Sequence, residues 1–226
     1  MKNNVINIKK TIEPGSLRDL GARPSGLAPH CLPIAGKSCQ AILTAMGCEG
    51  FAISRISTRN AFVVRKSESI YYLFVRPLYT GYRRVAALRF GGIPPEHDVD
   101  HIFAKNLAGK FGYSYVLVAL VPERVNRLHG FYEQFFQLPA ASEDVPGVCF
   151  ADVRIFDKAL GRNSKVRRPD VNLRQGYNLQ DRVSFGLTLK QQGIWNLTFG
   201  FSRPAPDEFV SRLQPLSTIG RIEAAG

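Results

Sequence analysis

The sequence predicts an α+β fold with a largely antiparallel sheet, and three observations support this prediction. Residues 51–90 alternate β-branched and aromatic residues with polar ones, in segments parted by turn-forming residues. Residues 115–121 form the most apolar run of the chain, which is typical of a central buried strand. Residues 38–47 and 122–138 instead repeat apolar residues at helical spacing. The chain therefore combines a sheet with packed helices.

The composition is that of a basic globular chain. It has 226 residues, of which 45% are hydrophobic, and 30 Lys and Arg against 18 Asp and Glu leave a net charge of +12. A chain of this length can bury a sizeable core. The charge favours a polyanionic partner, with nucleic acid ahead of an anionic membrane surface. We expect a cytoplasmic protein without a membrane span, because apolar runs of about 18 residues and a secretory signal are both missing.

Residues 1–35 are predicted to form a basic arm rich in proline and glycine, since they offer too little apolar surface to fold alone. The arm either wraps the domain, contacts a phosphate backbone, or is a poorly ordered leader. A helix capped by Ser38 follows and ends at Gly47. Residues 36–38, Gly-Lys-Ser, are similar to the end of a P-loop, but Cys31 stands where that motif requires glycine. We therefore predict no P-loop.

The cysteines favour buried free thiols over a structural zinc site. They form no C-x-x-C pair, and zinc sites usually show paired ligands at short spacing. The four residues are Cys31, Cys39, Cys48 and Cys149.

Residues 51–90 are expected to form three or four antiparallel strands. Strand alternation would bring several of their basic side chains onto one face. That face either contacts nucleic acid or is simply a solvated side of the sheet. The basic residues are Arg55, Arg59, Arg65, Lys66, Arg76, Arg83, Arg84 and Arg89.

Adjacent residues Asp100 and His101 could divide the work of a hydrolytic site. A carboxylate can ligate a hard cation such as Mg²⁺, and a neutral histidine can take a proton from water. Neighbouring side chains on a strand point to opposite faces, so these two converge only if the strand is distorted or ends there. The glycines and prolines of residues 91–95 favour such an irregularity.

The helix expected from Pro122 to residue 138 carries a polar stripe. Pro122 suits the first helical position. Asn126, His129 and Glu133 follow at spacings of i, i+3 and i+7, at the border of the apolar face. Side chains placed there can reach into a cleft beside the core, which is what a metal site requires.

These segments resemble the HNH, or ββα-metal (His-Me finger), nuclease family, in its zinc-free branch. The run DVDHI is similar to the opening of the HNH domain in the RNA-guided CRISPR nucleases. VNRLHG, whose Asn126 stands 26 residues after Asp100, resembles the closing segment of that domain. The resemblance implies that Asp100 and Asn126 bind the cation and that His101 is the general base. The family usually has a further asparagine before the helix that orients this histidine, and none stands there in this chain.

Further metal ligands are expected near the same helix. Related nucleases place helix-borne histidines on the cation, which implies a role for His129. Glu133 and His97 are additional candidates. The expected cofactor is Mg²⁺ or another divalent cation such as Mn²⁺, and we expect no structural zinc.

The domain organisation follows from these assignments. An α+β core of residues 36–140 would contain the HNH-like hairpin and helix, residues 98–137. Residues 141–226 would form a β-rich extension on the same domain, with a strand over 148–156, a hairpin over 183–201 and a closing helix over 206–214.

The function expected from the sequence is that of an HNH-type endonuclease, a metal-dependent hydrolase of phosphodiester bonds, with DNA favoured over RNA. The alternatives are a non-catalytic basic nucleic-acid-binding protein and a protein-binding effector. A protein partner or an oligomer is compatible with the sequence. Side chains expected to hold nucleic acid are Arg83, Arg84, Arg124, Arg127, Lys165, Arg167 and Arg168.

Overall fold

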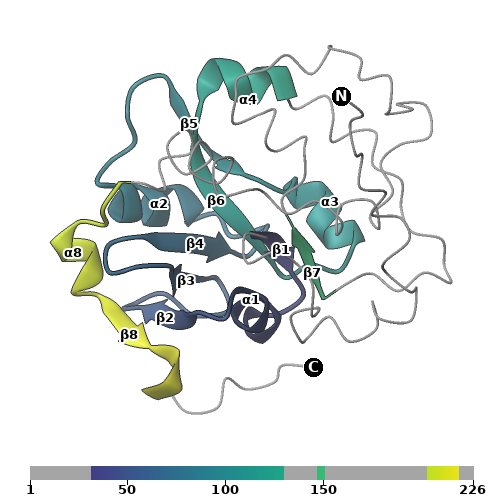
Figure 1. Ribbon diagram of the computed structural model, residues 1–226. Helices are drawn as coiled ribbons and strands as arrows, with labels where there is room; N and C mark the ends of the chain where they lie inside the picture. Colours follow the sequence, from purple (N-terminus) through teal and green to yellow (C-terminus); the bar gives the residue numbers. More distant parts are fainter. Residues whose placement is uncertain (1–31, 130–146, 151–202, 219–226) are drawn as a thin grey trace, which may run out of the picture.

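The computed structural model describes residues 32–129, 147–150 and 203–218, and these build one curled antiparallel sheet, a half-barrel (Figure 1). The strand order is β7-β1-β6-β4-β3-β2-β8, and β5 pairs with β6 off this path. The strands are β1 (Pro33–Gly36), β2 (Glu49–Ile53), β3 (Ala61–Arg65), β4 (Tyr71–Val75), β5 (His97–His101), β6 (Tyr115–Pro122), β7 (Val148–Phe150) and β8 (Leu213–Pro215).

Helices pack around this sheet. Among the described residues, no helix is long and apolar enough to cross a membrane. The helices are α1 (Cys39–Met46), α2 (Tyr82–Phe90), α3 (Lys105–Lys110), α4 (Glu123–His129) and α8 (Asp207–Val210), and a 3₁₀ turn, η4, covers Leu216–Thr218.

Strand β6 is the centre of the sheet, as its apolar sequence predicted. Val116 pairs with Ala35 of β1 and with Val75 of β4, so these strands lie on opposite edges of β6. Val118 pairs with His101 of β5 and also with β4, which places β5 on the same edge as β1. The two strands therefore follow one another along β6, and Figure 1 shows β6 leading from this sheet to α4.

The predicted fold class, α+β with an embedded HNH-like ββα-metal hairpin and helix, is wrong. The described chain is a mostly β half-barrel. Strands β5 and β6 are not a separate hairpin, because β6 also pairs with β1 and β4. The segment that resembles a nuclease motif is thus built into the large sheet, and its geometry is set by neighbours far away in the sequence.

Three or four strands were expected over residues 51–90; three are present, as β2, β3 and β4, whereas residues 82–90, expected to extend this pattern, form helix α2. The fully buried Val85, Ala86 and Arg89 recur at helical spacing, whereas a strand would bury every second residue. Gly91 ends the helix in the left-handed region, at φ 69°. The arginines of this stretch therefore do not line one strand face, as alternation had suggested.

The predicted boundaries of helix α1, Ser38 and Gly47, are confirmed. The Oγ of Ser38 accepts a hydrogen bond from the backbone N–H of Ala41 at 3.0 Å. Gly47 adopts φ 59°, and its N–H donates to the carbonyl of Leu43. The predicted start of α4 is wrong by one residue: Pro122 ends β6, and the helix begins at Glu123.

A buried arginine connects α2 to the C-terminal segment. The Nε of Arg89 donates to the carbonyl of Tyr71 at 2.7 Å, and its Nη1 donates to the carbonyl of Arg203 at 3.3 Å. Burial lowers the pKa of Arg89 to about 10, so it remains charged at neutral pH. The closing helix expected over 206–214 is shorter than predicted, because α8 gives way to β8, which pairs with β2.

Most of the expected arm and of the C-terminal extension lies outside the described residues. The predicted strand over 148–156 begins as β7 before the described segment ends at residue 150. The hairpin over 183–201 is not described. The division into three parts stays a prediction.

Candidate functional site

The candidate site lies where β5, β6, α2 and α4 meet. Strand β5 pairs with the second half of β6, and Asp98 is opposite Val121. The backbone N–H of Glu123, the first residue of α4, donates to the carbonyl of Glu96 at 2.8 Å. This bond and the contacts of α4 with both strands hold the helix beside β5.

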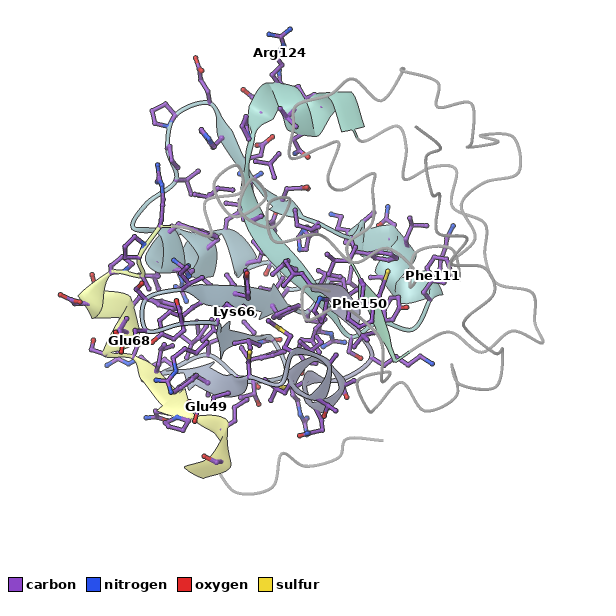
Figure 2. All side chains as sticks on the ribbon, viewed as in Figure 1. Glu49, Lys66, Glu68, Phe111, Arg124 and Phe150 are labelled. Carbon is purple, nitrogen blue, oxygen red and sulfur yellow. The ribbon has the colours of Figure 1, made fainter. Side chains whose placement is uncertain are left out.

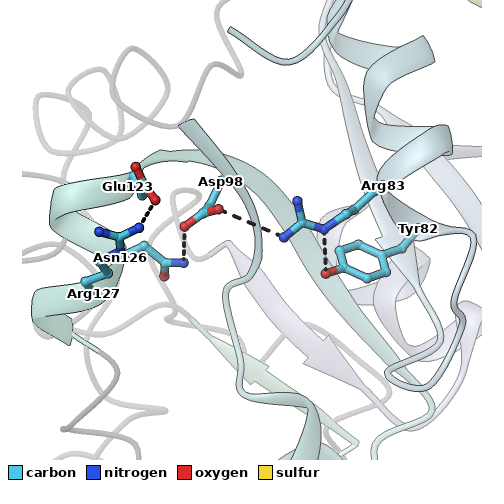
Figure 3. A network of polar contacts seen from close by, with 6 residues as sticks. All are labelled: Tyr82, Arg83, Asp98, Glu123, Asn126 and Arg127. Carbon is cyan, nitrogen blue, oxygen red and sulfur yellow. Dashed lines mark hydrogen bonds and ion pairs between the residues drawn. The ribbon is translucent and has the colours of Figure 1, made fainter. Parts of the chain in front are cut away.

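Asp98 is the centre of a polar network that joins three elements (Figure 3). Its Oδ2 accepts a hydrogen bond from Nδ2 of Asn126 on α4 at 3.2 Å. Its Oδ1 lies 3.9 Å from Nη2 of Arg83 on α2. The side chain of Asp98 is 28% exposed, whereas that of Arg83 is 58% exposed. The hydrogen bond to Asn126 is therefore the better ordered contact, and solvent screens the ion pair.

Two further contacts complete the network. The Nε of Arg83 donates to the hydroxyl of Tyr82 at 3.3 Å. On α4, Arg127 forms an ion pair with Glu123, one helical turn before it. Arg83 and Arg127 are thus held by partners within the protein.

Asn126 contacts Asp98 and not Asp100, to which the sequence analysis had coupled it. Both aspartates lie on one face of β5, two residues apart, and Asp100 is opposite Ala119. Position 100 is therefore about 7 Å farther along the strand from α4 than position 98 is. The register of β5 against β6 therefore places the carboxylate of Asp98, which is nearer to α4, against the amide of Asn126.

His101 faces the core on the other side of β5. It is 8% exposed, and the ring of Tyr82 lies 4.4 Å from its own, centre to centre. Within the part of the chain that the structure describes, its Nε2 has no hydrogen-bond partner. Desolvation lowers the pKa of His101, with smaller contributions from Lys105 and Arg83, against the attraction of Asp100. The imidazole is neutral at pH 7, but it is shielded from water.

The expected convergence of Asp100 and His101 is not seen. Strand β5 does end at His101, yet both residues keep regular pairing with β6, at Ala119 and Val118. Asp100 is half-buried and His101 is buried, as expected for neighbours on opposite faces. A water molecule bound near Asp100 would not lie beside the His101 ring.

The other predicted site residues are spread out or undescribed. The Nδ1 of His97 donates to the carbonyl of Pro95 at 2.9 Å, which is a local turn contact. Arg84 is exposed on α2, and Figure 2 shows Arg124 pointing from α4 away from the rest of the molecule. The side chain of His129 and the residues Glu133, Lys165, Arg167 and Arg168 lie outside the described residues.

The described residues do not fit the expected cation as they are arranged. They contain no group of three or more His, Cys, Asp or Glu that could hold a metal ion. Around Asp98, the amide nitrogen of Asn126 and the guanidinium of Arg83 occupy the directions from which a cation would approach. A metal would require the amide of Asn126 to turn, so that its carbonyl oxygen faced the ion, and Arg83 to withdraw.

Asp98 and Tyr82 were not predicted as members of this site. Strand alternation already places Asp98 on the face of Asp100, and antiparallel pairing favours the aspartate closer to the following helix. Tyr82 was not predicted because its segment was expected to be a strand, although Gly91 suits the end of a helix.

Comparisons of the chain with protein-family models, with curated proteins and with solved structures give no match. Function therefore has to be argued from the residues and their geometry.

Proposed function

We propose that the chain is a nucleic-acid-binding protein that holds the phosphate backbone by electrostatic contacts. The net charge of +12 is the observation that carries the proposal. Nucleic acids are polyanions that a basic chain attracts, because each neutralised phosphate releases a condensed counterion. Exposed basic side chains that have no acidic partner are the ones available for this contact.

The geometry favours binding over hydrolysis. His101 would need contact with water and with a substrate phosphate to act as a general base, and it is buried against Tyr82. Asp98 already has a hydrogen bond from Asn126 and an ion pair with Arg83. The HNH-type nuclease implied by the resemblance stays a prediction with this geometry against it.

One pair of assays tests the proposal. Fluorescence anisotropy with short single-stranded and duplex DNA and RNA, in EDTA, should show binding, because phosphate contacts need no metal. The same oligonucleotides with Mg²⁺ or Mn²⁺ should remain uncut. Absence of binding to all four would refute the proposal.

The nuclease alternative makes the opposite prediction. Metal-dependent cleavage by the wild type that is lost on His101→Ala, with binding unchanged, would replace the binding protein by an enzyme. A general base usually contributes about 10² to 10⁴-fold, so its loss would be easy to measure.

A further inference from the structure

Three loops meet around Tyr115, at the end of β6 that is remote from α4. Gly36, just before the Lys37–Ser38 connection, pairs with Tyr115. The Tyr115 hydroxyl donates to the carbonyl of Thr58, in the loop of residues 54–60, at 3.1 Å. The third loop, residues 76–81, begins at Arg76, whose backbone N–H donates to the carbonyl of Asn60 at 2.8 Å. We call this set of loops the Tyr115 end.

The Tyr115 end is strongly basic. None of its three loops contains an aspartate or a glutamate. Lys37, Arg55 and Arg76 are exposed and form no ion pair with the acidic side chains of the described residues. Burial raises the pKa of Tyr115, with a smaller raising effect of Cys39, while Arg76 and Arg59 lower it. Basic residues from two separate loops thus act electrostatically on the Tyr115 phenol.

Two other features distinguish these loops from an ordinary solvated surface. Leu78, two residues after Arg76, is 73% exposed and heads the exposed large hydrophobic residues of the described chain. Arg55 adopts φ 65°, in the left-handed region that residues with a side chain rarely occupy. A basic surface with an exposed apolar side chain can contact both phosphates and the faces of bases.

The basic side chains near α4 offer a weaker alternative, because only Arg84 and Arg124 of the four described arginines there lack an acidic partner among the described residues. Arg83 and Arg127 are paired with Asp98 and Glu123. A phosphate would have to compete with these carboxylates, whereas at the Tyr115 end it would meet Lys37, Arg55 and Arg76, which form no ion pair with an acidic side chain of the described residues.

We infer that the Tyr115 end is the nucleic-acid contact surface, with Lys37, Arg55 and Arg76 on the phosphates and Leu78 against a base. This inference rests on the proposed nucleic-acid binding and adds its location. The ligand is a nucleic acid strand, bound mainly through its backbone and with little sequence preference.

Charge reversal with a matched control tests the location. Arg76→Glu and Lys66→Glu change the net charge by the same amount. Lys66 is the control because it is exposed and follows the end of β3 that is remote from the Tyr115 end. Anisotropy with an oligonucleotide of about 30 nucleotides should show a several-fold loss for Arg76→Glu and little change for Lys66→Glu. The double variant Arg55→Glu/Arg76→Glu should lose at least about tenfold in affinity. The slope of log affinity against log salt should fall by the equivalent of about two phosphate contacts.

The folding of each variant is checked separately, so that a loss of binding can be attributed to the lost charge and not to unfolding. Circular dichroism and the thermal midpoint should match the wild type. If Arg76→Glu fails to fold, Arg76→Gln removes the charge with less disturbance and should still weaken binding more than Lys66→Gln does.

Leu78→Ser distinguishes a nucleic acid from other polyanions. Its affinity for single-stranded DNA should fall, while its affinity for heparin, which has no bases, should not change. An equal fall for both, or no fall for either, would remove Leu78 from the contact. Tighter binding of the wild type to an acidic peptide than to any oligonucleotide would replace the nucleic acid by a protein partner.

The outcomes separate the two proposals. A wild type that binds no oligonucleotide refutes the function itself. A wild type that binds, but loses as much affinity with Lys66→Glu or Arg124→Glu as with Arg76→Glu, refutes only the Tyr115 end, because binding would then follow the overall charge.

Discussion

The two ends of β6 carry similar charges in different settings. Near α4, Arg83 and Arg127 lie against Asp98 and Glu123, and their charges are compensated within the protein. At the Tyr115 end, Arg55 and Arg76 come from loops that contain no acidic residue. Compensated charges serve mainly the structure, and uncompensated ones attract a ligand.

This difference explains why a motif-like polar cluster need not be the site of function. Asp98, Asn126 and Arg83 satisfy one another, which leaves little capacity for a substrate. The Tyr115 end has no motif, since its side chains come from separate loops.

The salt dependence of binding should be the largest effect. If the Tyr115 end contacts about four phosphates, affinity for an oligonucleotide should fall about 100-fold between about 50 and 200 mM salt. The slope of log affinity against log salt should become shallower by about one for Arg76→Ala. For Arg127→Ala, whose guanidinium is already paired with Glu123, it should not change. Equal changes in both variants would contradict the distinction between the two ends.

Unlike binding, the stability of the fold should depend more on the network near α4 than on the Tyr115 end. Asp98→Ala leaves Asn126 and Arg83 without their shared partner in a partly buried position, and should lower the free energy of unfolding by about 1 to 2 kcal/mol. Arg76→Ala should change it by less than about 0.5 kcal/mol, as exposed substitutions usually do. Urea denaturation measures both. A larger loss for Arg76→Ala would show that the Tyr115 end is structural.

Local patterns in the sequence predicted the elements that depend on nearby residues. Ser38 and Gly47 fixed the ends of α1, and the apolar run from Tyr115 fixed β6. Helix α2 was missed because Ala86, Leu88 and Phe90 recur at every second position, as in a strand, over so short a stretch. A stronger indication was Gly91, which suits the left-handed end of a helix.

The site was less predictable because it depends on register and on loops that meet only in the fold. Asp98 and Asp100 are equivalent by alternation, and only the pairing of Asp98 with Val121 shows which one Asn126 reaches. The approach of Arg76 to the loop of residues 54–60 follows from the hydrogen bond between its backbone N–H and the carbonyl of Asn60. Nothing in their separate segments of sequence indicates it.

The third prediction concerns His101, beside the α4 network. Burial lowers its pKa, so the unfolded chain binds a proton more readily than the folded chain does below pH 6.5. The histidine therefore makes the protein less stable as pH falls from 6.5 toward the lowered pKa, by up to about 1.4 kcal/mol per pH unit.

His101→Leu tests this by removing the titrating group and its Nε2, which has no partner among the described residues. The variant should be about 1 kcal/mol more stable than the wild type at pH 7.5, and its advantage should grow toward pH 5. Urea denaturation across this range measures the difference. Parallel pH profiles would show that His101 is solvated, which would reopen its role as a general base.

The smallest effect is expected at Arg55, where backbone strain and ligand contact occur in one residue. Arg55→Gly and Arg55→Ala remove the same charge, so both should weaken oligonucleotide binding equally. Only glycine relieves the cost of φ 65°, and its greater freedom in the unfolded chain offsets part of that gain. Arg55→Gly should therefore be about 0.5 kcal/mol more stable than Arg55→Ala in urea denaturation. Equal stabilities would show that the loop of residues 54–60 changes conformation when Arg55 is replaced. Unequal binding would show that the backbone at this position, and not the arginine charge alone, contributes to the contact.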